Sequence, residues 1–301
     1  MAVDRCLNFT RAAAELHMSV SAVSRSIARL EDELGALLFD RDRRGMRPTP
    51  AARELAVVAS RMQSEWRELQ RSLSAGAALS GELRVFCSVT ATHQLLSPLL
   101  AAYREACPAV DILLITGDQA DGIERVRAGE ADVAVIARPP ELPPALRFLH
   151  ITDSPLRVCL PRNPCPLRER LDAAAPEERA ALLGQFAWIL PERGVSKDAI
   201  ESWLQDRYGF LPPVYARVAG HEAIVAMASL GLGVGVAPQL VIEASGLAES
   251  LEYALAEEGL PPLAVGLCTR TARVQDPVIA ELWRVAAEQV STAPFAIIPG
   301  R

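Results

Sequence analysis

Apolar residues recur at helical spacing early in the chain. Val23, Ile27, Leu30 and Leu34 follow one another at steps of four, three and four residues. This spacing places them on one face of an amphipathic helix. Gly35 suits the left-handed position just past the end of that helix.

A shorter helix is predicted before it. Asn8 or Thr10 can cap this helix, which runs to about Leu16 with Ala12 and Ala13 on its inner face. His17 and Met18 are expected to form the tight turn between the two helices, and Ser19 or Ser21 to cap the second helix.

The opposite face of the second helix is polar without being strongly charged. It carries Ser21, Ser24, Arg25 and Ala28, where a merely solvated face would carry Glu and Lys. Small hydroxyls and one arginine suit the DNA major groove, because arginine pairs with guanine and serine reaches bases or phosphates. A plain helical hairpin with a neutral face explains the same residues, so that alternative stays open at this point.

The next stretch predicts a two-stranded wing. Leu37–Phe39 can form a short buried strand, Asp40–Arg47 is a charged turn, and Met46–Thr49 returns. An arginine-rich loop between two strands can lie along the phosphate backbone. Thr49 then caps a third helix, with Pro50 in the first turn, where its missing N–H costs nothing.

The third helix is long and carries a continuous apolar seam. Spacings of three and four residues are typical of a coiled coil, and no stripe of comparable length lies nearby in the chain. A homodimer is therefore expected, although packing on the chain's own core is the alternative. The residues of the seam are Leu55, Val58, Met62, Trp66, Leu69 and Leu73.

Beyond a flexible hinge at residues 76–81, short apolar strands alternate with helices. Such alternation predicts α/β lobes with mainly parallel pairing. The expected strands are Leu83–Cys87, Ile112–Ile115, Val133–Ala137, Val158–Leu160, Trp188–Leu190, Val214–Val218, Val234–Ala237 and Ala264–Cys268. The expected helices are Gln94–Ala106, Gly122–Ala128, Lys197–Tyr208, Glu222–Leu230 and Pro277–Val290.

Length and composition indicate a globular chain of two or three domains. The 301 residues are half hydrophobic, and no run reaches the roughly 18 uncharged apolar residues that a membrane helix needs. The start shows no secretory signal, so a cytoplasmic protein with no membrane partner is expected. The six cysteines are scattered without a CxxC pair, which favours buried free thiols and no metal site.

Charge is distributed unevenly along the chain. The net charge is −6, yet residues 1–61 hold ten Arg against eight Asp and Glu. Residues 41–53 contain five arginines and a single acidic residue, Asp42. That local excess can meet phosphate, whereas the acidic remainder would be repelled by DNA, so only the first part is expected to bind DNA.

The segment AAAELHMSVSAVSRSIARLEDELGALLFDRDRRGMRPTPAA (residues 12–52) resembles the amino-terminal domain of LysR-type transcriptional regulators. The resemblance implies a winged helix-turn-helix over residues 1–48 and a linker and dimerisation helix over 49–75. Family members usually have further residues before Val3, so a truncated first helix is expected, and residues 48–52 depart from the family pattern. The implied DNA contacts are Ser19, Ser21, Ser24, Arg25, Arg29, Arg43, Arg44 and Arg47.

The rest of the chain resembles the periplasmic-binding-protein-like effector domain of the same family. That resemblance implies a two-lobed α/β domain over residues 82–291, with lobe I at 82–157 and 268–291 and lobe II at 158–267. A small carboxylate inducer would lie between the lobes. The implied partners are double-stranded DNA, the inducer, further copies of the chain in a homodimer or homotetramer, and RNA polymerase.

Several strand-to-helix turns are polar where such a ligand would bind, because helix N-termini hold carboxylates. Simple helix capping explains each turn singly, and His221 is equally well explained as a satisfied capping histidine. The candidate effector-binding residues are Ser88, Thr90, Thr92, Asp118, Gly194, Ser196 and His221.

Three segments, residues 80–100, 116–143 and 220–243, resemble a subgroup of the family that activates the ketol-acid reductoisomerase gene of valine and isoleucine synthesis. Acetolactate and acetohydroxybutyrate are the inducers that this resemblance implies. A regulator of another pathway that senses a different carboxylate is the first alternative.

A solute-binding protein and an α/β enzyme are two further alternatives. A solute-binding protein would carry an export signal and no DNA-binding head. An α/β enzyme would use His221 or Cys87, but no catalytic set can be assembled. The HExxH zinc motif fails at Val225, and Gly231, Gly233 and Gly235 run from helix to strand, the wrong order for a dinucleotide loop. No enzyme activity, metal or cofactor is therefore expected.

Overall fold

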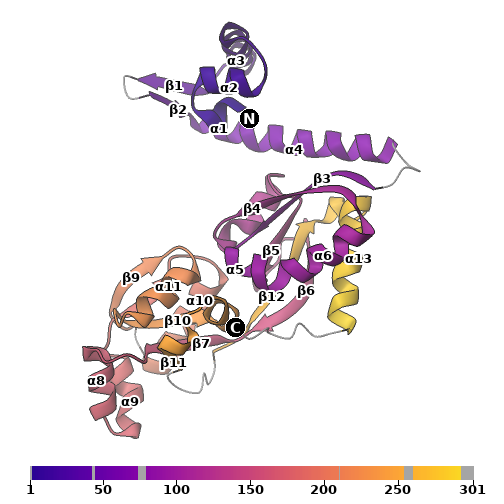
Figure 1. Ribbon diagram of the computed structural model, residues 1–301. Coiled ribbons are helices and arrows are strands. Elements are labelled where there is room, and N and C mark those ends of the chain that lie inside the picture. Colours follow the sequence, from indigo (N-terminus) through magenta and orange to yellow (C-terminus); the bar gives the residue numbers. More distant parts are fainter. Residues whose placement is uncertain (1, 43–44, 74–78, 210, 254–259, 293–301) are drawn as a thin grey trace. The chain divides into compact units, whose positions relative to one another are not determined.

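The computed structural model describes residues 2–42, 45–73, 79–209, 211–253 and 260–292 (Figure 1). The chain folds as two compact units. The first is built from the residues up to 75 together with 128–130, and the second from the remainder. Within the described residues, no helix is long and apolar enough to cross a lipid bilayer.

In its described residues, the first unit holds three short helices, a two-stranded antiparallel ribbon and one long helix. Its core is formed by alanines and branched side chains of the helices together with Leu38 and Phe39. In chain order the elements are α1 (Ala2–Cys6), α2 (Phe9–Glu15), α3 (Val20–Leu34), β1 (Phe39–Asp42), β2 (Gly45–Pro48) and α4 (Pro50–Leu73).

The caps of α2 and α3 lie where the sequence predicts them. The Asn8 side chain accepts a hydrogen bond from the backbone N–H of Arg11, and that of Ser19 accepts one from Ala22. Gly35 closes α3 in the left-handed conformation, with φ 64°. These caps give hydrogen-bond partners to backbone groups that the helix ends would otherwise leave unsatisfied.

The wing is tied to α3 by one carboxylate. Glu31 Oε1 accepts hydrogen bonds from the backbone N–H groups of Leu38 at 2.7 Å and Phe39 at 3.3 Å. Thr49 Oγ1 donates to the carbonyl of Leu37 at 2.7 Å and caps α4. The predicted bounds of the first strand are wrong, because Leu37, which is 69% exposed, and Leu38 both precede β1. The predicted turn at Asp40–Arg47 is also too long, because most of its residues pair as β1 and β2. The apolar stripe of α3 ends early, because Leu34 is exposed.

The second unit contains two five-stranded sheets, each flanked by helices (Figure 1). The first sheet has the order β4-β3-β5-β12-β6, in which β3 pairs in parallel with β4 and β5, and β12 runs antiparallel to β5 and β6. Its elements are β3 (Ser80–Cys87), α5 (Val89–Ala91), the π-helical turn η1 (Thr92–Leu96), α6 (Ser97–Ala106), β4 (Ala109–Thr116), the 3-10 turn η2 (Gln119–Asp121), α7 (Gly122–Arg127), β5 (Val133–Ala137), β6 (Leu146–Ser154), β12 (Leu263–Arg270), the 3-10 turn η4 (Thr271–Arg273) and α13 (Pro277–Thr292).

The second sheet has the order β11-β7-β10-β8-β9. Strands β8, β9 and β10 pair in parallel, and β7 runs antiparallel to β10 and β11. Its elements are β7 (Leu156–Pro161), α8 (Pro166–Ala173), α9 (Pro176–Leu183), β8 (Trp188–Pro191), α10 (Val195–Tyr208), β9 (Val214–Val218), α11 (His221–Ser229), β10 (Val234–Pro238), α12 (Gln239–Ala244), the 3-10 turn η3 (Ala248–Ser250) and β11 (Leu251–Tyr253).

Pairing in the two sheets is evenly divided between parallel and antiparallel, where the sequence predicted mainly parallel pairs. The reason is that β7 and β12 follow connections between the two sheets, so each enters its sheet against the direction of its neighbours. Residues 263–267, expected in lobe II, belong by hydrogen bonding to the first sheet, because β12 pairs with β5 and β6 along its length.

A buried ion-pair network joins the strands of the first sheet to α13. The Asp132 carboxylate accepts from the Arg84 backbone N–H at 2.9 Å and from the Arg84 and Arg273 guanidinium groups at 3.2 and 3.1 Å. Arg273 also pairs with Asp276, at 2.5 Å. Burial alone would raise the pKa of Asp132, but the charges and hydrogen bonds of Arg84 and Arg273 outweigh it and hold that pKa below its usual value.

We predict that Asp132→Asn lowers the free energy of unfolding by about 3–5 kcal/mol at pH 7, because it leaves two buried guanidinium groups without this carboxylate. The native pKa is lowered, so the contribution of Asp132 is complete above the ordinary value of about 3.9 and disappears as the pH falls through the lower native value. The difference between wild type and variant in urea unfolding should therefore shrink in acid. Glu124→Gln, which breaks an exposed pair with Arg127, is the control and should change stability little.

Candidate DNA-binding face and ligand cleft

The polar face of α3 is open to solvent in the first unit. Ser21, Arg25 and Ala28 are exposed and Ser24 is half-buried. Ser19 lies at the helix N-terminus, where its hydroxyl also lies 3.1 Å from that of Ser21. Ser21, Ser24, Arg25 and Ala28 share one side of the helix by their spacing of three and four residues. The face therefore has the shape and chemistry of a helix that enters a groove.

The remaining basic residues of the predicted DNA contact differ in their surroundings. Arg29 is exposed but its Nε donates to Glu33 at 3.0 Å, an i,i+4 pair that holds part of its charge. Arg47 is exposed on β2, opposite Asp40 in the ribbon register. Arg43 and Arg44 lie outside the described residues.

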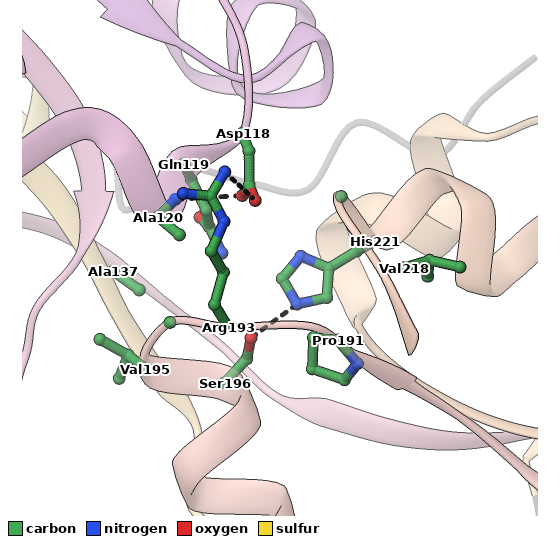
Figure 2. A pocket seen from close by; sticks show the side chains of 12 residues that line it. Asp118, Gln119, Ala120, Ala137, Pro191, Arg193, Val195, Ser196, Val218 and His221 are labelled. Carbon is green, nitrogen blue, oxygen red and sulfur yellow. Dashed lines mark hydrogen bonds and ion pairs between the residues drawn. The ribbon is translucent and has the colours of Figure 1, made fainter. Parts of the chain in front are cut away.

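A cleft in the second unit is lined by residues of both sheets and their helices (Figure 2). The first sheet contributes the turn after β4 and the end of β5, and the second contributes the ends of β8 and β9 with the starts of α10 and α11. The lining residues are Asp118, Gln119, Ala120, Ala137, Pro191, Arg193, Gly194, Val195, Ser196, Val218, Gly220 and His221.

Ser196 and His221 form a buried pair in this cleft. His221 Nε2 lies 2.9 Å from Ser196 Oγ, and the two residues are 6% and 2% exposed (Figure 2). His221 directly follows Gly220, with φ 82°, and Ser196 comes two residues after Gly194, with φ 89°, so the chain turns sharply into both helices. Burial lowers the pKa of His221 despite the carboxylates of Glu222 and Asp118, which keeps the imidazole neutral at pH 7.

Arg193 bridges the cleft, a contact that the sequence did not indicate. Its guanidinium reaches Asp121 at 2.5 and 3.2 Å. It also lies 3.4 Å from Asp118 (Figure 2). The two carboxylates, in the turn that follows β4, are thereby attached to the segment between β8 and α10. The Arg193-Gly194 pair in the sequence gives no sign of this, because an exposed arginine before a helix is ordinarily solvated.

The hydroxyl residues after β3 have other contacts. Thr90 is buried and donates to Glu222 Oε1 at 2.6 Å, a second bridge between the lobes. Thr92 donates to the carbonyl of Ser88 and lies 2.9 Å from Cys87 Sγ, and Ser88 caps α5. Four of the predicted effector residues line this cleft, namely Asp118, Gly194, Ser196 and His221. The other three, Ser88, Thr90 and Thr92, do not line it.

The cleft is narrow in this arrangement. Its volume is about 20 Å³, which is room for about one water molecule. A carboxylate that also carries a hydroxyl and a ketone requires more space. Such a ligand enters only if the lobes separate or Arg193 moves.

Two family models cover most of the chain. A bacterial regulatory helix-turn-helix protein of the lysR family matches residues 1–53, and a LysR substrate binding domain matches residues 76–291. The transcriptional activator IlvY of Salmonella typhimurium is 36% identical over 92% of this chain and 94% of its own length. The transcriptional regulator IlvY of Escherichia coli is likewise 36% identical, over 92% and 93%.

Solved structures share the fold at lower identity. A full-length OxyR variant from Pseudomonas aeruginosa matches with a TM-score of 0.66 at 21% identity, over 98% of this chain and 93% of that one. Full-length CbnR in complex with its target DNA matches with a TM-score of 0.62 at 21% identity, over 95% and 96%. The matched families and the named relatives are transcriptional regulators rather than enzymes. The chain therefore belongs to the LysR family of transcriptional regulators, with an amino-terminal DNA-binding domain and a two-lobed α/β effector-binding domain.

Proposed function

We propose that this regulator activates the ketol-acid reductoisomerase gene of valine and isoleucine synthesis in response to acetolactate or acetohydroxybutyrate. The similarity to proteins named as IlvY activators, at 36% identity over 92% of the chain, supports the pathway. The regulator acts in the cytoplasm, as a homodimer or as a pair of dimers, and as an activator it contacts RNA polymerase on the promoter.

The observation that carries DNA binding is the exposed serine and arginine face of α3 beside the wing. Arg25 is exposed on that face, in a position to donate to a guanine edge, and Ser21 and Ser24 lie on the same side. Arg47 on β2, with the arginines of the wing loop, supplies phosphate contacts that fix orientation without reading sequence.

Arg25→Ala should weaken binding to the reductoisomerase promoter about tenfold to a hundredfold, since a bidentate base contact is worth about 1–3 kcal/mol. Binding to unrelated DNA should change much less. Fluorescence anisotropy at one fixed salt concentration measures both affinities. Arg104→Ala, which removes an exposed arginine of α6, is the matched control. Undiminished affinity of the Arg25 variant for its own promoter would show that α3 does not read the bases.

The apolar seam of α4 supports assembly with a second copy. Within the first unit Val58, Met62, Trp66 and Leu69 are exposed by 41%, 63%, 61% and 46%, at helical spacings of four, four and three residues. Pairing two such helices buries this surface, each fully covered large side chain contributing about 1.5–3 kcal/mol.

Met62→Glu combined with Trp66→Glu should therefore shift the protein from dimer to monomer at micromolar concentration, because each dimer would bury four carboxylates. Sedimentation velocity measures the change. Glu65→Gln lies on the same helix beside the seam, and this variant should sediment as the wild type does. A doubly substituted protein that remained dimeric would place the main interface elsewhere.

The cleft supports recognition of a small hydroxy-keto carboxylate. The neutral Ser196–His221 pair offers a hydroxyl and an imidazole to the ligand's hydroxyl and ketone, and Arg193 offers a cation to its carboxylate. A ligand that takes Arg193 from Asp118 and Asp121 opens a contact that now bridges the lobes. Its differential affinity for the two lobe arrangements then shifts their populations, and this shift changes how the dimers sit on DNA.

Ser196→Ala should weaken acetolactate binding about tenfold, because it removes one hydrogen bond and leaves the buried His221 without its partner. Isothermal titration calorimetry measures the affinity. Ser291→Ala is the control, since this exposed serine makes one hydrogen bond at the end of α13, far along the chain from the cleft. Equal affinities of the wild type and the Ser196 variant would remove this pair from the proposed site.

A further inference from the structure

A second and much larger cavity lies beside the cleft in the second unit. Its volume is about 620 Å³, within the range of small-molecule sites, whereas the cleft holds about 20 Å³. The cavity is lined by the segment that follows β5, the segment that leads into β12, and one face of α10. Val195, the first residue of α10, lines both the cavity and the cleft.

The α10 wall of this cavity has two parallel rows of side chains. Val195, Ala199 and Trp203 follow one another at i,i+4 spacing and form an apolar row. Trp203 is only 5% exposed, with its ring held by the rings of Trp188 and Tyr208 at 6.3 and 6.4 Å. The cavity therefore has a firm aromatic base.

The second row of α10 is polar and acidic. Asp198, Ser202 and Asp206 also follow at i,i+4 spacing and line the cavity. Lys197 approaches Asp198 only to 3.8 Å, because its ammonium pairs more closely with Glu201 at 2.9 Å. Two exposed carboxylates and a hydroxyl thus border the apolar row.

The segments before and after the two sheets' connections supply a rigid part of the lining. Pro139, Pro140, Pro261 and Pro262 line it, and each proline has a fixed φ and no backbone N–H. Arg138 lies at the end of this wall, with its guanidinium 5.8 Å from the centre of the Phe148 ring. Arg138 is thus the basic residue of a lining whose acidic residues are Asp198 and Asp206, and it is exposed.

We propose that this cavity binds a free α-amino acid with an apolar side chain. The ammonium group would bind to Asp198 and Asp206, and the side chain to Trp203 and the prolines. The carboxylate would bind to Arg138 once its exposed side chain turns from the Phe148 ring toward the cavity. The lining carries two carboxylates and one guanidinium, so it favours a zwitterion or a cation over an anion. The cavity thus differs in ligand class from the cleft, whose proposed ligand is an anion.

Binding in this cavity is coupled to the cleft through α10. The turn that presents Val195 to the cavity presents Ser196 to His221 in the cleft. An amino acid that holds α10 against the proline wall therefore changes the affinity of the cleft for its own ligand, and by linkage the cleft ligand changes the affinity for the amino acid by the same factor. This coupling rests on the proposed function, whereas amino-acid binding itself does not.

The test uses the full-length protein and L-leucine, followed by isothermal titration calorimetry and by the fluorescence of the tryptophans beside the cavity. Saturable binding is expected in the millimolar range or tighter. Isoamylamine and 4-methylpentanoate, which each keep the side chain but only one charge, should bind at least about tenfold more weakly. Absence of saturable leucine binding, or equal binding of either analogue, overturns the proposal.

Three variants locate the binding. Asp198→Asn combined with Asp206→Asn, and separately Arg138→Gln, should each weaken leucine binding about tenfold or more, and these exposed changes leave the folded core intact. Ala199→Trp fills the cavity and should abolish binding. Glu169→Gln, an exposed acid on α8, should have no effect. Leucine binding that survives all three variants lies elsewhere and overturns the assignment.

Acetolactate and promoter affinities are measured on the same proteins. A protein that binds acetolactate and its promoter but not leucine overturns only the inference of this second site. A protein that binds leucine but not acetolactate retains this site and loses the proposed inducer. If saturating leucine leaves the acetolactate affinity of the wild type unchanged, the coupling through α10 is refuted.

Discussion

The second unit depends on one buried carboxylate. The chain completes most of the first sheet, leaves to build the whole of the second, and returns as β12 and α13. Asp132, at the start of β5, binds Arg84 of the outgoing part and Arg273 of the returning part. Burying these charges costs desolvation energy, and removing one partner leaves another charge buried without compensation. The network therefore holds β12 and α13 in one register against strands that lie about a hundred and thirty residues earlier in the sequence. Both the cleft and the larger cavity take a wall from this returning segment or its neighbour β5.

Much of the fold follows from local signals in the sequence. The caps at Asn8 and Ser19, the closing glycine at Gly35 and the strands Val133–Ala137 and Val214–Val218 were all predicted from residue type and spacing. The missed elements lack such signals. Strand β6 (Leu146–Ser154) alternates irregularly between buried and exposed positions because it lies at the edge of its sheet and is interrupted by a bulge in its pairing with β12. Helices α8 and α9 are short and begin with proline, so their sequences are typical of loops.

The candidate site was predictable only as far as backbone geometry determines it. Residues at helix starts after left-handed glycines, such as Ser196 and His221, converge in the cleft because parallel strands bring their carboxyl ends together. The roles of Arg193 and Glu222 could not be predicted from the sequence. Their partners, Asp121 and Thr90, lie far away in the sequence and belong to the other lobe. Thr90 and Thr92 were expected in the site, but their hydroxyls are engaged by Glu222 and by the backbone of Ser88. Spacing along the chain carries no information about such cross-lobe pairs.

The hydrogen bonds from Leu38 and Phe39 to Glu31 have a mechanical consequence for the operator. They fasten the start of the ribbon to the last turn of α3, so the helix proposed to read the bases and the wing proposed to contact the phosphates move as one piece. Such a head cannot adjust the distance between its groove contact and its backbone contact. The duplex must therefore fit this fixed distance by changing its own groove width or curvature. Operators whose base steps deform easily are then favoured, even at positions that no side chain touches.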